Sequence, residues 1–445
     1  MKHFLPILIL LAALFSACSS NNQPVDTTSS SVAKLKSFAF APQDSFPGLK
    51  EAVFRIEERL DTGLVYNVDS IRFGTPLTRV VPKFTFVNSV GSATMRMGDS
   101  LITLTGKDTL DFTLSPIYLT IQSSDLTTTK VYEIRVSAYT RDPELYTWTT
   151  RTLSAFPPAD VEQRVLRLGD TFCWFTNDAI CTALYRSTDL GTTWTPAALS
   201  GLPDACRVGA IISLGDTVLY YAEGSRVYTS RDAASWNSRD LTGSGLTFCT
   251  MAFAFREMAW AVAEDAAGAL QLVSLRGDTL GGESVPLDDL FPVSGFATVN
   301  FTSTSDRERV MLLGGYARNG QQLHNRWNIE YSVISRRMRI TDYAIEQPDF
   351  ETLSGVSVLW YNNSLLMLGG MDRQGLYAGN TILCSLDEGL NWAPLDSTKS
   401  ALPDTYTPRR AQQAFVHDRN IYVFGGQNNT ENFTDVYRGR LNSID

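Results

Sequence analysis

The sequence predicts an all-β protein with two folded parts, a β-sandwich followed by a β-propeller. Apolar residues alternate with polar ones in many short runs separated by turn residues, and no convincing helical pattern interrupts them. From Leu166 to the C-terminus, a unit with a similar order of strands and turns recurs. The chain has 445 residues, of which 44% are hydrophobic, and this length is sufficient for two globular units.

The first 18 residues have the features of a lipoprotein signal peptide. Lys2 and His3 precede an apolar segment, Phe4–Phe15, and small residues then lead to Cys18. The ending Leu-Phe-Ser-Ala-Cys resembles a bacterial lipobox, which implies that the thiol of Cys18 is diacylglycerated and becomes the new N-terminus. The alternative is an ordinary secretory signal with an incidental cysteine.

Residues 19–31 form a polar, low-complexity segment that we expect to act as a flexible linker. Lipid chains on Cys18 would anchor the protein to one leaflet without a spanning helix. Ser19, rather than aspartate, follows the cysteine, which favours the outer membrane in the usual bacterial sorting pattern. The expected location is therefore the cell envelope, with the face of the outer membrane left open.

Residues 32–140 show the period-two pattern of a β-sandwich. Ile117, Leu119 and Ile121 share one face of a strand, and similar pairs of apolar residues recur along the segment. The stretch from Ser115 to Tyr139 resembles the last hairpin of bacterial immunoglobulin-like domains, which implies an Ig-like spacer module. The proline-containing junction Thr140–Glu144 separates this module from the second part.

Residues 145–445 contain the repeat, and three of its strands end in a pair of glycines. The pairs are Gly314–Gly315, Gly369–Gly370 and Gly425–Gly426, and their first glycines are 55 and 56 residues apart. This spacing resembles the repeat of roughly 50 residues found in kelch propellers. The sequence therefore predicts kelch-like blades in this half of the chain.

A second repeated motif resembles the Asp-box of sialidase-type propellers. It contains a serine, an aspartate, a glycine and a tryptophan at fixed spacing, and its polar side chains are expected to hold a hairpin turn. Because the motif stabilises a turn, it predicts fold and not catalysis. The third copy is one residue shorter and has Ala234 in place of glycine. The predicted structural residues are Ser187, Asp189, Gly191, Trp194, Ser230, Asp232, Trp236, Ser385, Asp387, Gly389 and Trp392.

The repeat pattern predicts six blades, of which the third is the least regular because it has neither a glycine pair nor a box. The segment Tyr146–Leu153 precedes the first full unit and reads as an additional outer strand. We expect it to complete the last blade and close the ring, which would leave no exposed sheet edge. The units begin near Leu166, Val208, Thr250, Gly295, Ser354 and Ala411.

No cofactor or metal site is expected from the cysteines and histidines. Cys173–Cys181 or Cys206–Cys249 could form disulfides, or these residues could remain buried thiols. No Cys-x-x-Cys spacing occurs, and the two histidines outside the leader, His324 and His417, fall in different units. A metal-dependent oxidase needs converging imidazoles, so this class is not favoured.

The candidate ligand-binding residues lie near the starts of inner strands. Arg207 and Arg410 occupy positions expected near the mouth of a central channel, where guanidinium groups could contact an anion or a sugar. Gln413 and Asn300 could join them, and Trp327 could offer a stacking surface on a loop. The alternative is structural: the arginines could pair with carboxylates of neighbouring blades, and the tryptophan could belong to the core between blades.

A further pattern is carried by three stretches, Tyr66–Pro82, Asp111–Phe112 and Arg141–Trp148. Together they resemble a group of Bacteroidales lipoproteins. The likeness covers nearly the whole mature chain, although Val68 and Arg72 stand where the group typically has lysine and proline. It implies an Ig-like domain followed by a six-bladed kelch-like propeller, a location in the envelope and no known active site.

The leading functional hypothesis is a non-enzymatic envelope lipoprotein whose propeller binds a glycan or another envelope protein. The alternatives are a carbohydrate-active propeller enzyme, such as a sialic-acid mutarotase or a glycosidase, and a purely structural scaffold. We expect a monomer that meets the membrane through its N-terminal lipid. The formal net charge of −9 argues against nucleic acid as a partner.

Overall fold

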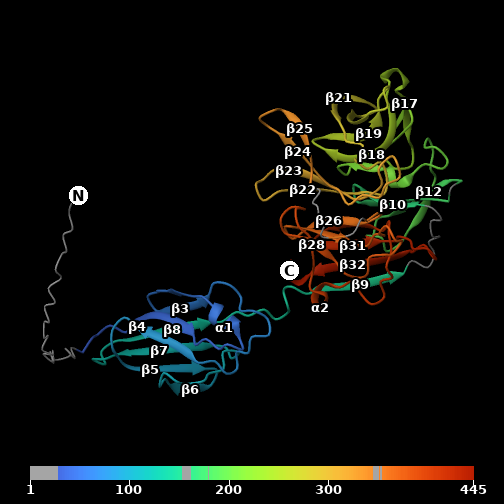
Figure 1. Ribbon diagram of the computed structural model, residues 1–445. Helices are drawn as coiled ribbons and strands as arrows, with labels where there is room; N and C mark the ends of the chain where they lie inside the picture. The colour runs from blue at the N-terminus through green and yellow to red at the C-terminus, as the bar shows by residue number, and fades with distance from the viewer. Residues whose placement is uncertain (1–28, 153–161, 179, 344–349, 351–352, 445) are drawn as a thin grey trace, which may run out of the picture. The chain divides into compact units, whose positions relative to one another are not determined.

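The computed structural model describes residues 29–152, 162–178, 180–343, 350 and 353–444, and within these ranges the chain is almost entirely β. The predicted signal peptide and Cys18 lie outside the described residues. The chain forms two compact units whose boundary lies between Arg141 and Asp142 (Figure 1). This position falls within the junction expected over residues 140–144. No helix in the described ranges is long and apolar enough to cross a membrane.

The N-terminal unit contains a two-stranded sheet, formed by β1 and β4, and a six-stranded sheet in the order β2-β3-β8-β7-β5-β6. Within the larger sheet, only β3 and β8 pair in parallel. Its strands are β1 (Leu35–Phe40), β2 (Phe54–Glu57), β3 (Thr62–Asn67), β4 (Pro82–Phe86), β5 (Val90–Met97), β6 (Ser100–Thr103), β7 (Ile117–Ser123) and β8 (Thr129–Arg135).

The core of this unit follows the predicted alternation. Ile117, Leu119 and Ile121 of β7 are all buried, as are the aromatic rings of Phe38 and Phe40 from β1. The sequence pattern missed one short helix, α1 (Pro47–Glu51), because five residues are too few to display a helical period.

The C-terminal unit contains six four-stranded antiparallel sheets in the described residues. Five of them consist of consecutive strands: β10 (Glu162–Leu168) to β13 (Thr195–Ala197), β14 (Ile212–Leu214) to β17 (Asn237–Asp240), β18 (Thr247–Phe255) to β21 (Thr279–Pro286), β22 (Ala297–Thr302) to β25 (Arg337–Asp342), and β26 (Ser357–Tyr361) to β29 (Ala393–Pro394). The intervening strands are β11 (Thr171–Asn177), β12 (Thr182–Ser187), β15 (Val218–Glu223), β16 (Arg226–Ser230), β19 (Met258–Glu264), β20 (Leu270–Arg276), β23 (Glu308–Leu313), β24 (Arg326–Ser332), β27 (Ser364–Leu368) and β28 (Leu383–Ser385).

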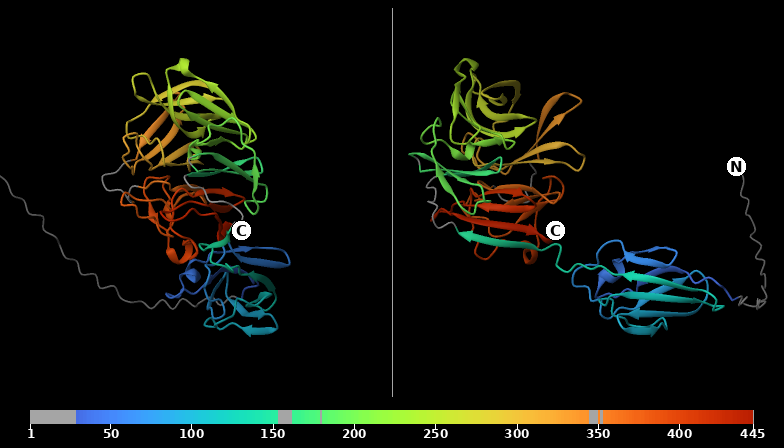
Figure 2. Two further views of the ribbon diagram at one scale, coloured as in Figure 1. Left: turned by 90° about the vertical axis from the view of Figure 1, so that its right-hand side faces the viewer. Right: turned by 180° about the vertical axis from the view of Figure 1, so that it is seen from behind.

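The sixth sheet joins the two ends of this unit. Strands β30 (Gln413–His417), β31 (Asn420–Phe424) and β32 (Asp435–Leu441) are followed by β9 (Tyr146–Thr152), which pairs with β32 along its whole length (Figure 2). The prediction that this early strand completes the last sheet is confirmed. Pairing covers the outer edge of β32, which would otherwise present unpaired backbone groups.

The weakest predicted unit forms a complete sheet of four long strands, β18 to β21. Its inner strand, β18, carries two irregularities in its pairing with β19, one between Phe248 and Thr250 and one between Met251 and Phe253. These bulges interrupt a strict alternation of side chains, which explains why the sequence pattern is least regular here.

The glycine pairs allow neighbouring sheets to approach closely. All six glycines have positive φ. A Cβ atom on Gly314 would lie 2.3 Å from the carbonyl oxygen of Leu353, and one on Gly369 or Gly425 would lie 2.1 Å from the side chain of Gln412 or Gln163. Gln163 belongs to the next sheet, and Leu353 and Gln412 lie just before the first strand of theirs, so a side chain at these positions would force the sheets apart.

The two full-length Asp-boxes form the predicted turn. The hydroxyl of Ser187 donates to Asp189 at 2.8 Å and accepts from the backbone N–H of Gly191 at 2.9 Å. The indole of Trp194 donates to the carbonyl of Gly191 at 3.1 Å. The copy that starts at Ser385 repeats these three contacts with nearly the same distances.

The short box corrects one prediction. The indole of Trp236 donates to the carbonyl of Ala233, and Ala233 adopts a positive φ of 64°. Ala233 therefore takes the role of the box glycine, and Ala234 does not. Removal of one residue leaves one left-handed position in this turn, whereas the first box has two, Leu190 and Gly191.

Each box also contacts the preceding sheet. Trp194 lies 6.0 Å from Phe424 between ring centroids, and Trp236 lies 6.2 Å from Phe175. A Cβ atom on Gly389 would meet Met311 at 2.4 Å. The boxes thus connect sheets as well as shaping turns.

All five described cysteines are free thiols, so neither of the two disulfides considered from the sequence is formed. Cys173, Cys206 and Cys384 are buried, and Cys181 is exposed. Burial raises the pKa of Cys173 and of Cys206 to about 11. The three buried thiols act as small core residues.

Substitution of Gly314 by alanine tests the contact between sheets. Gly277 is a matched control, because its φ of 59° is close to the 61° of Gly314 but a Cβ atom there would meet no other atom within 4 Å. Both variants lose about 1 kcal/mol from the left-handed backbone. We expect Gly314→Ala to lose several kcal/mol more in chemical denaturation, because backbone must move. Equal losses would contradict the role of the glycine pairs.

The boxes also predict a pH dependence of stability. Backbone donation from Ser235 lowers the pKa of Asp232, and at Asp189 desolvation is outweighed by hydrogen bonds from Thr193 and Ser187, so that pKa is lowered too. A carboxylate whose pKa is lowered in the folded state stabilises the fold at pH values above its unfolded pKa of about 4. This stabilisation is lost as the pH falls through the folded-state pKa.

In melting-temperature measurements, the variant Asp189→Asn/Asp232→Asn should therefore be less stable than the wild type at pH 7. The difference should shrink as the pH falls below about 4. Asp170→Asn is the control because the Asp170 side chain is fully exposed. A difference between variant and wild type that persists unchanged at low pH would contradict the assignment.

Candidate functional site

A channel runs through the C-terminal unit, and residues from the inner strands of all six sheets, or from the loops just before them, line its narrow end. This narrow cavity has a volume of about 170 Å³. It is followed by a middle cavity of about 320 Å³ and a wide cavity of about 740 Å³. The six sheets therefore surround a common central space.

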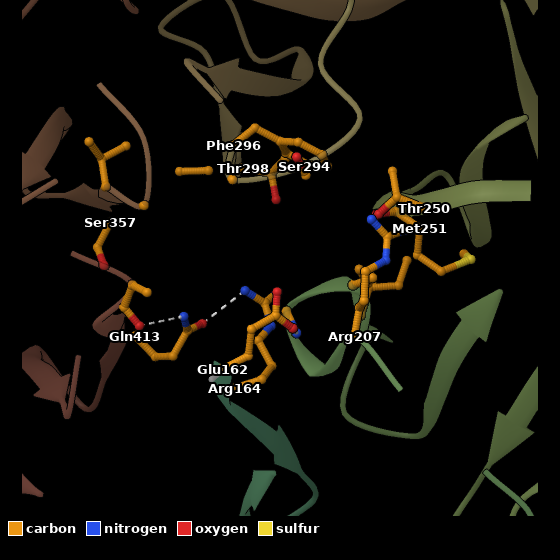
Figure 3. Close-up of a pocket in the computed structure, with 18 of the residues that line it drawn as sticks. Glu162, Arg164, Arg207, Thr250, Met251, Ser294, Phe296, Thr298, Ser357 and Gln413 are labelled. Carbon is orange, nitrogen blue, oxygen red and sulfur yellow. Dashed lines mark hydrogen bonds between the residues drawn. The ribbon is translucent and has the colours of Figure 1, made fainter. Parts of the chain in front are cut away.

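The narrow end brings charged and polar side chains together from different sheets (Figure 3). Glu162 and Arg164 come from β10, and Gln413 comes from β30. Arg207 and Thr250 lie beside each other, across the open centre from Gln413. Alternation along β10 directs Glu162 and Arg164 to the channel, while the intervening Gln163 is buried between sheets.

Arg164 is held in place by neutral acceptors. Its Nε donates to the carbonyl of Ile211 at 3.1 Å, and its Nη1 donates to Oε1 of Gln413 at 2.8 Å. Desolvation lowers the pKa of Arg164 to about 10, and the charge of nearby Glu162 opposes this shift. Within the described part of the chain, no carboxylate forms an ion pair with Arg164, and its partly buried charge is compensated only at longer range by Glu162.

Arg207 and Glu162 complete the charged group. Arg207 precedes the short helix η1 (Val208–Ala210), and its guanidinium donates to the carbonyl of Cys249. Glu162 accepts a hydrogen bond from the backbone N–H of Gly209 at 3.1 Å. Among the described lining residues of the narrow end, Glu162 is the one carboxylate against two arginines. The balance of charge therefore favours an anionic ligand group.

The predicted ligand-binding residues do not form a single cluster. Arg207 and Gln413 line the narrow end, as expected, whereas Asn300 lines the middle and wide cavities. Arg410 is absent from all three linings and pairs through its backbone with Gln427. These positions follow from the strand order, since the inner strands run along the channel from its narrow to its wide end.

Trp327 corrects a further prediction. It lies in β24 and not on a loop, its side chain is 7% exposed, and its ring packs 5.2 Å from that of Phe291. The alternative considered from the sequence, a tryptophan in the core between sheets, describes it correctly. Burial on this scale leaves no face for stacking on a ligand.

Sequence reasoning missed Glu162 and Arg164, because the first repeat unit was placed from Leu166 onward. The segment Glu-Gln-Arg-Val-Leu-Arg-Leu at 162–168 does alternate, and this is the signal that could have identified an earlier start. Strand β10 begins four residues before the expected start at Leu166, and both Glu162 and Arg164 fall within these four residues.

Arg409 shows the structural use of an arginine that the sequence considered for Arg410. It is fully buried, forms an ion pair with Asp435, and its guanidinium lies 3.6 Å from the ring centroid of Phe433. Its Nη1 also donates to the carbonyl of Gly425. Arg409 therefore stabilises the last sheet next to its glycine pair and does not face the channel.

The described residues contain no group of three or more histidine, cysteine, aspartate or glutamate side chains arranged to hold a metal ion. The described lining of the narrow end offers guanidinium, carboxylate, amide and hydroxyl groups. These groups bind and orient polar ligands through hydrogen bonds and charge.

The strands and the central channel define an all-β protein with a propeller unit. Residues 142–445 match the DUF6242 beta propeller domain, and residues 19–136 match the DUF6242 N-terminal domain, a domain of unknown function. The chain belongs to the DUF6242 family. The expectation of an N-terminal domain followed by a propeller is confirmed. No curated protein matches the chain.

Paired substitutions test the electrostatic contrast between Arg164 and Arg409. Removal of Arg409 leaves the partly buried carboxylate of Asp435 with the Tyr437 hydroxyl but without its cationic partner, so Arg409→Met should lose about 3–5 kcal/mol of unfolding free energy. Arg164→Met removes a desolvated charge that has no ion-pair partner in the described residues, so its unfolding free energy should stay the same or rise. Chemical denaturation of both variants measures this, and a loss in Arg164→Met as large as that in Arg409→Met would contradict the description of the site.

Proposed function

We propose that the C-terminal unit is a six-bladed, kelch-like propeller with Asp-boxes that serves as a binding module for a glycan. Its narrow channel end takes the carboxylate of an acidic sugar. The observation that carries this proposal is the pair Arg164 and Arg207, which face one small cavity without forming ion pairs in the described residues. A ligand carboxylate would balance the excess positive charge of two arginines over Glu162 through charge-assisted hydrogen bonds.

The other lining groups support a sugar as the carrier of that carboxylate. Thr250, Thr298 and Gln413 offer hydroxyl and amide groups, and such groups match sugar hydroxyls as donors and acceptors. The volume of about 170 Å³ is below the range of roughly 300–1,000 Å³ typical of drug-sized ligands. The narrow end therefore suits the end of a glycan rather than a whole oligosaccharide.

The remaining parts of the chain fit the same proposal. Lipidation of Cys18 would anchor the protein to the outer membrane. The linker at residues 19–31 would connect this anchor to the N-terminal unit, which would act as an Ig-like spacer before the propeller. The support for anchoring is the signal-like segment that ends in the lipobox resemblance. Intact-mass measurement of the protein purified from bacterial membranes tests it, with Cys18→Ser as the variant that loses the lipid mass.

A second candidate function is favoured by Glu162. A glycosidase uses two carboxylates on either side of the scissile bond, and the described lining of the narrow end provides one. A single carboxylate beside two arginines can instead move a proton at a bound sugar, as in the interconversion of its anomers. The rival is thus an isomerase of acidic sugars rather than a hydrolase.

Isothermal titration calorimetry of the chain with an acidic monosaccharide, a uronic or a sialic acid, tests the binding proposal. The neutral parent sugar is the ligand control. We expect Arg164→Met and Arg207→Met each to weaken binding by roughly 10- to 100-fold, because each loses a charged hydrogen bond. Arg410→Met is the matched control, since Arg410 lies outside the channel lining, and it should bind like the wild type.

The outcomes separate the proposals. Equal binding of the neutral sugar, or equal weakening in Arg410→Met, would contradict recognition of the carboxylate. Faster exchange between anomers in nuclear magnetic resonance, lost in Glu162→Gln while binding remains, would replace the binding module with the isomerase. Absence of sugar binding together with a defined crosslinked envelope protein would support the scaffold instead.

A further inference from the structure

The wide end of the channel forms a second lined space whose composition differs from that of the narrow end. Its cavity of about 740 Å³ is lined by turns and strand ends of the second to fifth sheets. We propose that this space is a subsite for neutral sugar rings of the same ligand, which makes the ligand an oligosaccharide with a terminal acidic sugar. This inference rests on the proposed function of the narrow end.

The cavities are continuous. The narrow and middle cavities share Arg164, Ile212 and Thr298, and the middle and wide cavities share Gly215, Ala254 and Asn300. The order of these residues along β22 and β18 is the same as the order of the cavities. A ligand group at Arg164 and another at Asn300 therefore occupy one connected space.

The length of this space exceeds that of a single sugar. Phe296 lines the narrow end, and Thr302, on the same extended segment, lines the wide end. Six residues of extended chain span about 20 Å at roughly 3.3 Å per residue. The volume also increases toward the wide end, so the larger part of a ligand would enter and remain there.

The wide end offers an aromatic surface next to an amide. Trp360 is half-buried and lines the cavity, and Phe301 stacks against it at 4.8 Å between centroids with an angle of 26° between the rings. Asn300 is exposed in the cavity, and its Nδ2 is held by the carbonyl of Ala254 at 2.6 Å, which fixes the orientation of its Oδ1. A rigid aromatic surface beside oriented polar groups is a combination that binds ring faces and hydroxyls.

The charges of the wide end disfavour a second carboxylate. Arg309 pairs with Glu330 and Glu388, and Arg256 lies over the ring of Tyr331 at 3.6 Å from the centroid. The lining also includes the carboxylates of Glu257 and Glu308. Like charges repel, so the neutral part of the ligand belongs here and the acidic end belongs at Arg164.

The test is a length series of oligosaccharides, from one to four sugars, that carry a single acidic sugar at one end. Calorimetry with the wild-type chain should show affinity that rises at least tenfold from the monosaccharide to the longest member. Trp360→Ala and Asn300→Ala should remove this gain and keep the affinity for the monosaccharide. Trp360→Phe preserves an aromatic ring and should retain most of the gain, and Asn237→Ala, on the exposed strand β17, is the distant control. Circular dichroism confirms that each variant is folded.

The failures of the two proposals can be told apart. Affinity that does not depend on length, with monosaccharide binding still lost in Arg164→Met, overturns the wide subsite and keeps the narrow one. Binding of a neutral oligosaccharide that depends on Trp360, with no binding of the acidic monosaccharide, supports the wide subsite and overturns the carboxylate site. No binding of any member overturns both.

Discussion

The close approach of neighbouring sheets at the glycine pairs is the constraint on which the channel depends. Without a Cβ atom, Gly369 and Gly425 allow the buried side chains of Gln412 and Gln163 to reach backbone carbonyls across the seam. These glutamines are the residues next to Gln413 and Arg164 on the inner strands. Backbone packing at the seams therefore positions the side chains that face the channel.

Two arginines in this unit illustrate opposite uses of a buried charge. Arg409 has a carboxylate, a carbonyl and an aromatic ring as partners, and it contributes to the last sheet. Arg164 has neutral acceptors, and its charge is not compensated by a neighbouring ion pair in the described structure. Arg164 thus links sheets through hydrogen bonds, and part of its charge stays available to the channel.

Much of the architecture could be predicted because it depends on local sequence patterns. The glycine pairs, the Asp-boxes and the early strand Tyr146–Thr152 each depend on a short run of residues, and each lies where the sequence indicates. The short box could not be predicted in detail. Either Ala233 or Ala234 could replace the glycine, because the spacing permits both. The residue that does so is the one whose carbonyl accepts the hydrogen bond from the indole of Trp236.

The site was harder to predict because its residues occupy equivalent positions that do not repeat in sequence. Gln412 and Gln163 contact corresponding glycines, so their neighbours Gln413 and Arg164 are equivalent positions on adjacent inner strands. One position carries an amide and the other a guanidinium, and they bind each other across the junction between the last and first sheets. The repeated residues specify the ring of sheets. The charge of the site comes from Arg164, which differs from its equivalent Gln413 where the last sheet meets the first. The charged lining of this channel therefore depends on the strands that complete the ring of sheets.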